Sequence, residues 1–355
     1  MNEKTSVRVL RSCYDNLKSK TCTEQCRSIQ NLKSVGIFAI VIFAMCGAVA
    51  QAQQQAKVAK IGWLGALSLA SDAGRELLGR EIRALGYVDG KNIAIEYRYA
   101  GDKLDRLPAL ADELVRLKVD VILATATPVA LAAQNAATTI PIVFLNVPDP
   151  VAAGLVDSLA RPGGNITGVT TIAAVLAGKR LELLKETVPK LSRVGVLWDP
   201  LDQGSALQWK ESQLPARDLG LQIHSLEVSS AEKYEAAFKE AVKARSAALA
   251  VAGSPLALSN QKRIADLAAK NRLPAIASRS DFATAGGLMS YGGDRTEPYR
   301  RVASIVDKIL KGRKPGDIPV EQPTKFEFVI NLKTAKQIGV TIPQSVLYRA
   351  DKVIK

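Results

Sequence analysis

Four dipeptides in which a polar residue precedes proline are candidates for contacting a small polar molecule, because each follows a predicted strand. Proline is favoured at the first position of a helix, and Ser, Thr or Asp as the cap before it. In open parallel sheets, ligands bind beyond the carboxyl ends of the strands, near helix N-termini with unpaired N–H groups. Either these pairs only begin helices or they also surround a site, and their occurrence in both halves of the chain favours a site. The pairs are Thr127-Pro128, Asp149-Pro150, Asp199-Pro200 and Ser254-Pro255.

The polar side chains near these strand ends suit both signs of charge. Thr127 and Ser254, at the starts of predicted helices, are suited to a carboxylate or another acceptor. Asp149, Asp199 and Asp281 are suited to an ammonium group or to hydroxyl groups.

For each aromatic or hydroxyl side chain near the same strand ends, the sequence leaves two roles open. Trp63, Trp198 and Tyr291 would either stack on a planar ligand or simply pack at a strand terminus. Ser68 and Ser71 follow the first predicted strand and would either contact the ligand or cap the first helix.

The composition disfavours catalysis, metal binding and cofactor binding. His224 is the only histidine, and it lies inside an apolar predicted strand, where a structural role is expected. PGGN at residues 162–165 lacks a following Gly-Lys-Ser/Thr, and neither a G-x-G-x-x-G after the first strand nor a G-x-S-x-G elbow is present. We therefore predict no enzyme, no metal site and no cofactor. All the cysteines lie within the first 50 residues: Cys13, Cys22, Cys26 and Cys46.

The first 52 residues have the features of a secretory signal peptide. Residues 1–33 carry seven Lys or Arg against three acidic residues, and an apolar run follows over Val35–Ala50. Small residues predict cleavage after Ala50 or Ala52, and hence export to the periplasm. The apolar run is short for a spanning helix, but a membrane-anchored form is the alternative. Lipid attachment at Cys46 is less favoured, because Phe43 and Met45 are unsuitable neighbours.

The net charge of +14 falls to +10 without the leader, and it does not indicate nucleic-acid binding. Basic residues are interspersed with acidic ones, as in GREIRALG and KRLELLKETVPK. Such patterning is typical of solvated helical faces, and export argues against DNA as a partner.

From Lys60 onward, apolar runs alternate with amphipathic segments, which predicts an α/β fold. Several runs are apolar at consecutive positions, as expected for parallel strands covered on both faces by helices. About ten strands are more than a single sheet usually holds in a chain of this length. We therefore predict two doubly wound parallel-sheet domains joined by hinge strands. The predicted strands are residues 60–65, 92–99, 119–126, 140–146, 165–171, 193–199, 221–228, 247–253, 273–278 and 287–293. The predicted helices include residues 72–85, 104–117, 176–187, 231–245, 255–271 and 297–311.

We place the first domain break near Thr170–Ala174. The chain ends in IPVEQPTKFEFVINLKTAKQIGVTIPQ, whose strand and helix follow a Pro-rich stretch, and we interpret that stretch as a late return between the domains. The predicted N-terminal lobe comprises residues 58–171 and 285–323, and the C-terminal lobe residues 172–284 and 324–355. Polar strand ends in both lobes suggest a cleft that closes on a small molecule.

Long segments of the chain resemble the ABC-transporter substrate-binding proteins related to the tryptophan- and tyrosine-binding proteins. The resemblance covers residues 57–355 and is most specific over residues 124–171. It rests on ATATPVALAAQNAATTIPIVFLNVPDPVAAGLVDSLARPGGNITGVTT, RLELLKETVPKLSRVGVLWDP and YRRVASIVDKILKGRKPGDIPVEQP.

The resemblance implies the type I periplasmic-binding-protein fold, no catalytic activity, and delivery of a solute to an ABC permease in the inner membrane. It also implies an aromatic amino acid as the ligand class, with Thr127 near the ligand carboxylate and Asp281 near its ammonium group. The loops expected to line the cleft contain Ser68, Thr125, Thr127, Asn146, Asp149, Asp199, Ser254, Asp281 and Tyr291.

We therefore predict an extracytoplasmic, monomeric solute-binding component of an ABC importer that captures a small organic molecule. The alternatives are an enzyme or a ligand sensor on the same two-domain scaffold. An enzyme would need a nucleophile, a base or a cofactor loop, and a sensor would need a DNA-binding or signalling module. Only the leader is expected before residue 57.

Overall fold

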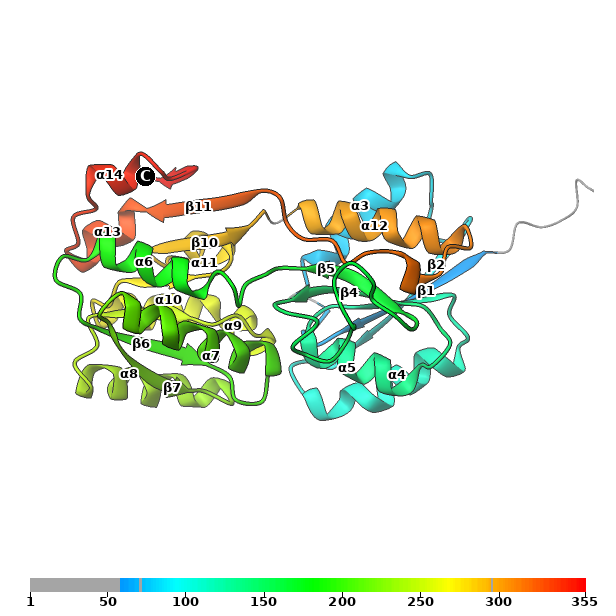
Figure 1. Cartoon of the computed structure of the whole chain (residues 1–355), viewed down its shortest axis with the longest axis horizontal. Coiled ribbons are helices and arrows are strands. Elements are labelled where there is room, and N and C mark those ends of the chain that lie inside the picture. The colour runs from blue at the N-terminus through cyan, green and yellow to red at the C-terminus, as the bar shows by residue number, and fades with distance from the viewer. Residues whose placement is uncertain (1–57, 70–71, 295) are drawn as a thin grey trace, which may run out of the picture. The chain divides into compact units, whose positions relative to one another are not determined.

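Two β-sheets organise the part of the chain that the computed structural model describes, namely residues 58–69, 72–294 and 296–355 (Figure 1). The first sheet has five parallel strands in the order β2-β1-β3-β4-β5, and we call it, with its helices, the first lobe. Its strands are β1 (Ala59–Gly65), β2 (Ile93–Tyr99), β3 (Val121–Ala124), β4 (Ile142–Val147) and β5 (Ile166–Thr170).

The second lobe is built on a seven-stranded sheet in the order β12-β11-β10-β9-β8-β6-β7. β10 and β11 are antiparallel, whereas the other neighbouring strands run parallel. The strands are β6 (Arg193–Trp198), β7 (Gln222–Glu227), β8 (Ala248–Val251), β9 (Ala275–Ala277), β10 (Met289–Gly293), β11 (Phe326–Asn331) and β12 (Lys352–Ile354). The predicted fold class, two mainly parallel α/β sheets, is confirmed.

Helices cover both faces of the first sheet, which explains its consecutive apolar residues. α4 (Leu107–Arg116) and α5 (Thr127–Ala136) pack on one face through residues such as Leu114 and Val129. α3 (Gly74–Ala84) and α12 (Glu297–Leu310) pack on the other through residues such as Leu78 and Val302.

The second sheet is covered in the same way. α6 (Ala177–Thr187) and α7 (Gln203–Asp218) share one core with α13 (Leu332–Ile338) and α14 (Gln344–Leu347). α8 (Tyr234–Lys243), α9 (Pro255–Ser259), α10 (Gln261–Lys270) and α11 (Ser280–Thr284) pack around the other core. The predicted helix over residues 255–271 is therefore two helices, α9 and α10, which meet at Asn260. Short 3-10 turns lie at Leu104–Arg106, Ala231–Lys233 and Pro315–Asp317.

The chain passes between the lobes after β5, after β10 and before β11. The sequence predicts residues 285–323 in the first lobe, but β10 (Met289–Gly293) belongs to the second sheet. It pairs parallel with β9 and antiparallel with β11, so the second passage follows Gly293 rather than residue 285. α12 then returns to the first lobe and packs beside α3.

Among the described residues, no helix is long and apolar enough to cross a membrane. The predicted signal peptide and its cleavage sites lie outside the described residues.

Candidate functional site

A cavity of about 490 Å³ lies between loops that follow strands of both sheets. The first lobe contributes the loops after β1, β3 and β4, and the second lobe the loops after β8, β9 and β10. The passages between the lobes also border the cavity, through Thr171, Asp294 and Pro323. Open parallel sheets bind ligands at this edge, and pockets for small molecules usually measure about 300–1,000 Å³.

Five of the nine predicted site residues line this cavity: Thr125, Thr127, Asn146, Ser254 and Asp281. They come from both lobes, because the parallel strands of each sheet end at the edge facing the cavity. Asn146 has a left-handed backbone (φ 59°) where the pairing of β4 with β5 shifts register.

Four predicted site residues do not line the cavity. Asp149 accepts hydrogen bonds from the N–H groups of residues 151 and 152, both at 3.0 Å, so its carboxylate closes a turn and begins no helix. Asp199 is buried and accepts from the Leu201 N–H at 2.9 Å. Tyr291 packs between Phe326 and Phe328 in the second lobe. Ser68 is half-buried in the loop after β1.

The two predicted tryptophans pack within their own lobes. Trp63 is fully buried in the core beneath α3 and α12. Trp198 stacks on Trp209, with ring centroids 6.1 Å apart, and donates to Ser225. His224, on β7, contacts Glu240 at 3.0 Å and is not part of the cavity wall.

The helix N-termini around the cavity differ in how they are capped. Ser254 accepts from the Ala257 N–H at 3.0 Å and caps α9, as its sequence position suggests. α7 is capped by Asp202, which accepts from the Ser205 N–H, and so the helix does not start at Asp199-Pro200. α5 begins at Thr127 without a side-chain cap among the described residues, and the cavity borders its first turn. Its N–H groups and positive dipole end are therefore available to an anion.

Several charged cavity residues are absent from the sequence-based candidates. Arg279 donates to Asp281 at 2.9 Å, so the Asp281 carboxylate already has a cationic partner. Asp72, at the start of α3, lines the opposite wall and accepts from the Gly74 N–H at 2.9 Å. Burial raises the pKa of Asp72, against the effect of its hydrogen bonds and of Arg279. Asp202 and Asp294 complete the acidic lining.

Within the described chain, no group of three His, Cys, Asp or Glu side chains is arranged to hold a metal ion.

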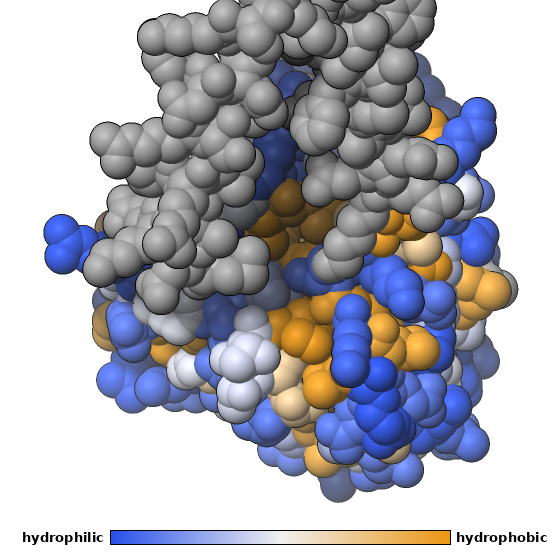
Figure 2. Space-filling view, turned by 90° about the vertical axis from the view of Figure 1, so that its right-hand side faces the viewer, coloured by the Kyte–Doolittle hydropathy of each residue, from blue (hydrophilic) through white to orange (hydrophobic). Residues whose placement is uncertain are grey.

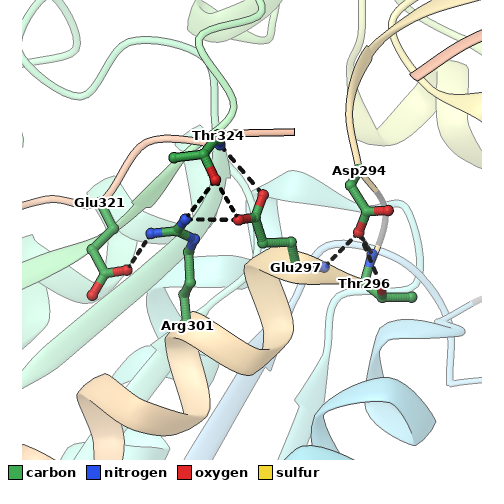
Figure 3. A network of polar contacts seen from close by, with 6 residues as sticks. All are labelled: Asp294, Thr296, Glu297, Arg301, Glu321 and Thr324. Atoms are coloured by element: carbon green, nitrogen blue, oxygen red, sulfur yellow. Dashed lines mark hydrogen bonds and ion pairs between the residues drawn. The ribbon is translucent and has the colours of Figure 1, made fainter. Parts of the chain in front are cut away.

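A polar network joins two of the passages between the lobes (Figure 3). Arg301 of α12 donates to Glu297 and to Glu321, both at 2.7 Å, and to Thr324 at 3.0 Å. The Thr324 hydroxyl in turn donates to Glu297 at 2.8 Å. Burial disfavours the Glu297 carboxylate, but Arg301 and Thr324 outweigh it and lower its pKa to about 2. Glu297 is the first residue of α12 and directly follows the second passage, whereas Thr324 lies in the third. The network therefore ties the third passage to the start of α12.

Replacing Arg301 by methionine is expected to lower the free energy of unfolding by about 3 kcal/mol at pH 7. The variant leaves Glu297, only 5% exposed, as an uncompensated buried charge. The loss should shrink near pH 4, because without its cation Glu297 has a raised pKa and becomes protonated. Urea unfolding of the wild type and the variant at pH 7 and pH 4 measures the difference in the free energy of unfolding. Arg300→Met, on the exposed side of the same helix, is the control, and an equal loss in both variants would contradict the argument.

The arrangement is that of a two-lobed α/β protein with a cavity between its lobes. The chain belongs to the family of ABC transporter substrate binding proteins, whose sequence model matches residues 71–354. This confirms the resemblance stated above and, with the solved structures below, the type I periplasmic-binding-protein architecture.

Three similar proteins bear on the function. The tyrosine-binding protein of Clostridioides difficile (strain R20291) is 32% identical over 255 residues, 72% of this chain and 73% of that protein. A conserved domain protein from Vibrio cholerae has 29% identity and a TM-score of 0.80, covering 84% of this chain and all of that one. An ABC domain from Streptococcus pneumonia, solved in complex with L-Trp, has 27% identity and a TM-score of 0.76, covering 83% and 99%.

Proposed function

We propose that this chain is the extracytoplasmic receptor of an ABC importer, which captures an amino acid and delivers it to a permease in the inner membrane. The observation that carries the proposal is the cavity between the lobes, into which the uncapped N-terminus of α5 opens. The signal peptide predicted over residues 1–52 would export the chain to the periplasm, where it would act as a monomer. Capture and release need only opening and closing of the lobes, so no catalytic step is proposed.

Aromatic amino acids are the first ligand class to test. One relative is named a tyrosine-binding protein, and another was solved in complex with L-Trp. An α-carboxylate fits the first turn of α5, where Thr127 begins the helix and Thr125 and Asn146 line the adjoining wall. The walls also contain apolar side chains, among them Leu67, Leu258 and Phe282, against which a ring would pack.

A thermal-shift screen of the purified chain tests the proposal. L-Trp, L-Tyr, L-Phe and the other standard amino acids are compared with sugars and nucleosides. At 100 times its dissociation constant, a ligand should stabilise the protein by about 2.7 kcal/mol. Stabilisation by one or a few amino acids supports the proposal. Stabilisation by sugars or nucleosides alone, or by none of the compounds, overturns the assignment of an amino acid.

A further inference from the structure

Arg180, on α6 in the second lobe, is a buried cation, and no carboxylate of the described residues pairs with it. Its side chain is only 3% exposed. Hydrophilic side chains normally lie at the surface, as they do on the face of the molecule shown in Figure 2. Burial lowers the pKa of Arg180 to about 10, so the guanidinium is still charged at neutral pH. A buried charge without an opposite charge destabilises the folded state, and its presence here needs an explanation.

The guanidinium of Arg180 contacts both the first passage between the lobes and α7. Its Nη2 donates to the carbonyl of Ala173 at 2.7 Å and, over a longer distance of 3.4 Å, to Oε1 of Gln208 on α7. Its Nη1 has no hydrogen-bond partner among the described residues. Ala173 lies in the first passage, residues 171–176, which joins β5 to α6. Arg180 therefore holds the backbone of this passage and the side chain of Gln208 together.

Gln208 extends this connection from α7 to the wall of the cavity. Its Nε2 donates to the carbonyl of Gly253 at 3.0 Å, and its Oε1 accepts from the N–H of the same residue at 3.1 Å. Nε2 also donates to the carbonyl of Gly204 at 3.2 Å. Because Oε1 accepts from both Gly253 and Arg180, the amide is fixed in one orientation. Gly253 directly precedes Ser254, which lines the cavity and caps α9.

The connection runs from the cavity wall to a segment that must change when the lobes move. Ala173, Gln208 and Ser254 all line the cavity, whereas Arg180 lies behind its wall. A ligand that packs against Ser254 restrains Gly253 and, through the two side chains, the carbonyl of Ala173. Closure of two lobes is absorbed by the backbone of the segments that join them, and the first passage is one of these. Residues that lower stability are retained where function requires them.

We propose that Arg180 is a positioning residue that couples occupation of the cavity to the conformation of the first passage, through Gln208 and Gly253. The inference rests on the proposed function, because it takes the cavity as the ligand site and lobe closure as the response. It gives a residue that does not touch the ligand a share in controlling closure. It also accounts for a cation without an anion inside the second lobe.

Hydrogen–deuterium exchange of the full chain without ligand tests the connection itself. Arg180→Met keeps an apolar stem and removes the donors, so the N–H groups of residues 171–176 and 252–257 should both exchange about tenfold faster. Gln208→Met breaks the connection beyond Arg180 and should accelerate exchange in residues 252–257 alone. Lys179→Met removes the neighbouring, half-exposed cation of α6 and is the matched control, in which both segments should exchange as in the wild type.

Affinity and thermal stability separate a positioning role from a purely structural one. Calorimetry with L-Trp, L-Tyr and L-Phe identifies the amino acid that the wild type binds most tightly. Arg180→Met should bind it about 10-fold more weakly, which is the usual size for a residue that couples two sites. The Tm without ligand should be no lower than that of the wild type, because the variant removes a buried unpaired charge. In a double-mutant cycle, the losses of affinity in Arg180→Met and Gln208→Met should not add, since both break one connection.

The outcomes distinguish this inference from the proposed function. Wild-type exchange of residues 252–257 in Arg180→Met overturns the connection, and affinity within twofold of the wild type overturns the coupling, while the receptor proposal stands in both cases. If Arg180→Met fails to fold or melts at a lower temperature, Arg180 stabilises the fold, and the inference is wrong. If the wild type binds none of the standard amino acids, the proposed function fails, and the coupling to ligand fails with it.

Discussion

Replacing Gly204 by valine is expected to weaken ligand binding by about 10- to 100-fold without destabilising the fold. Gly204 lies in the first turn of α7 in the second lobe. A Cβ at this position would come within 2.7 Å of Thr127 Oγ1 and 2.9 Å of Pro148 Cδ, both in the first lobe. Thr127 is only 2% exposed, in keeping with this close approach. Overpacking of this kind costs about 1–3 kcal/mol. Here it destabilises the close approach of the two lobes, and the same free energy is lost from ligand binding.

The stability of the variant separates this effect from misfolding. The backbone of Gly204 is not left-handed, so a side chain causes no backbone strain there. Glycine is also a poorer helix former than valine. The free energy of unfolding of the variant should therefore equal that of the wild type. Calorimetry measures the affinity, and small-angle X-ray scattering with and without ligand measures closure. Gly79→Val, in α3, is the control, because a Cβ there meets only Arg83 Nη1 at 3.6 Å. Wild-type affinity in Gly204→Val would show that the ligand-bound form lacks this contact.

The fold class was predictable because it depends on local patterns. β3 (VILA) and β8 (ALAV) are buried at every position, which is what consecutive apolar residues indicate in a parallel sheet. The membership of β10 was not predictable in the same way. Its segment MSYGG could join either sheet, and its place depends on pairing with β11, about forty residues later, as in Met289 with Ile330.

The candidate site was predictable only as far as the strand ends. That rule leads to Thr125, Thr127 and Asn146, because parallel strands bring their carboxyl ends to one edge. It does not separate a side chain that faces the cavity from one bonded within its own loop. Asp149 and Asp199 are of the second kind, since each accepts hydrogen bonds from N–H groups two or three residues further on.

The charged cavity residues that sequence reasoning missed acquire their importance from distant contacts. In the sequence, Asp72 is an ordinary residue at the start of a predicted helix. Only the pairing of β1 with β2 brings Trp63 and Tyr99 close to its carboxyl group. Asp202 is similar: the Asp-Pro pair at residues 199–200 suggested the helix start, whereas α7 begins three residues later. A pattern search that scores every Asp, Ser or Thr three residues before a predicted helical N–H would have found Asp202.

Asp202→Asn is expected to raise the free energy of unfolding at pH 8 by about 2–4 kcal/mol, with little effect at pH 4. Asp202 is 3% exposed, and burial, reinforced by the charge of Asp199, raises its pKa to about 7 despite the Ser205 N–H. Between about pH 4 and 7 the folded chain therefore holds a proton on Asp202 that the unfolded chain has released. Stability falls as the pH rises through this window, by about 1.4 kcal/mol for each pH unit. Asparagine removes the titration and remains a good helix cap.

Urea unfolding of both chains at pH 4, 6 and 8 measures this difference directly. Groups that titrate alike in both chains, such as Glu297 with its pKa of about 2, cancel in the comparison. Asp112→Asn, which is exposed, should differ from the wild type by less than about 0.5 kcal/mol at every pH. A constant difference across the three pH values would contradict the raised pKa.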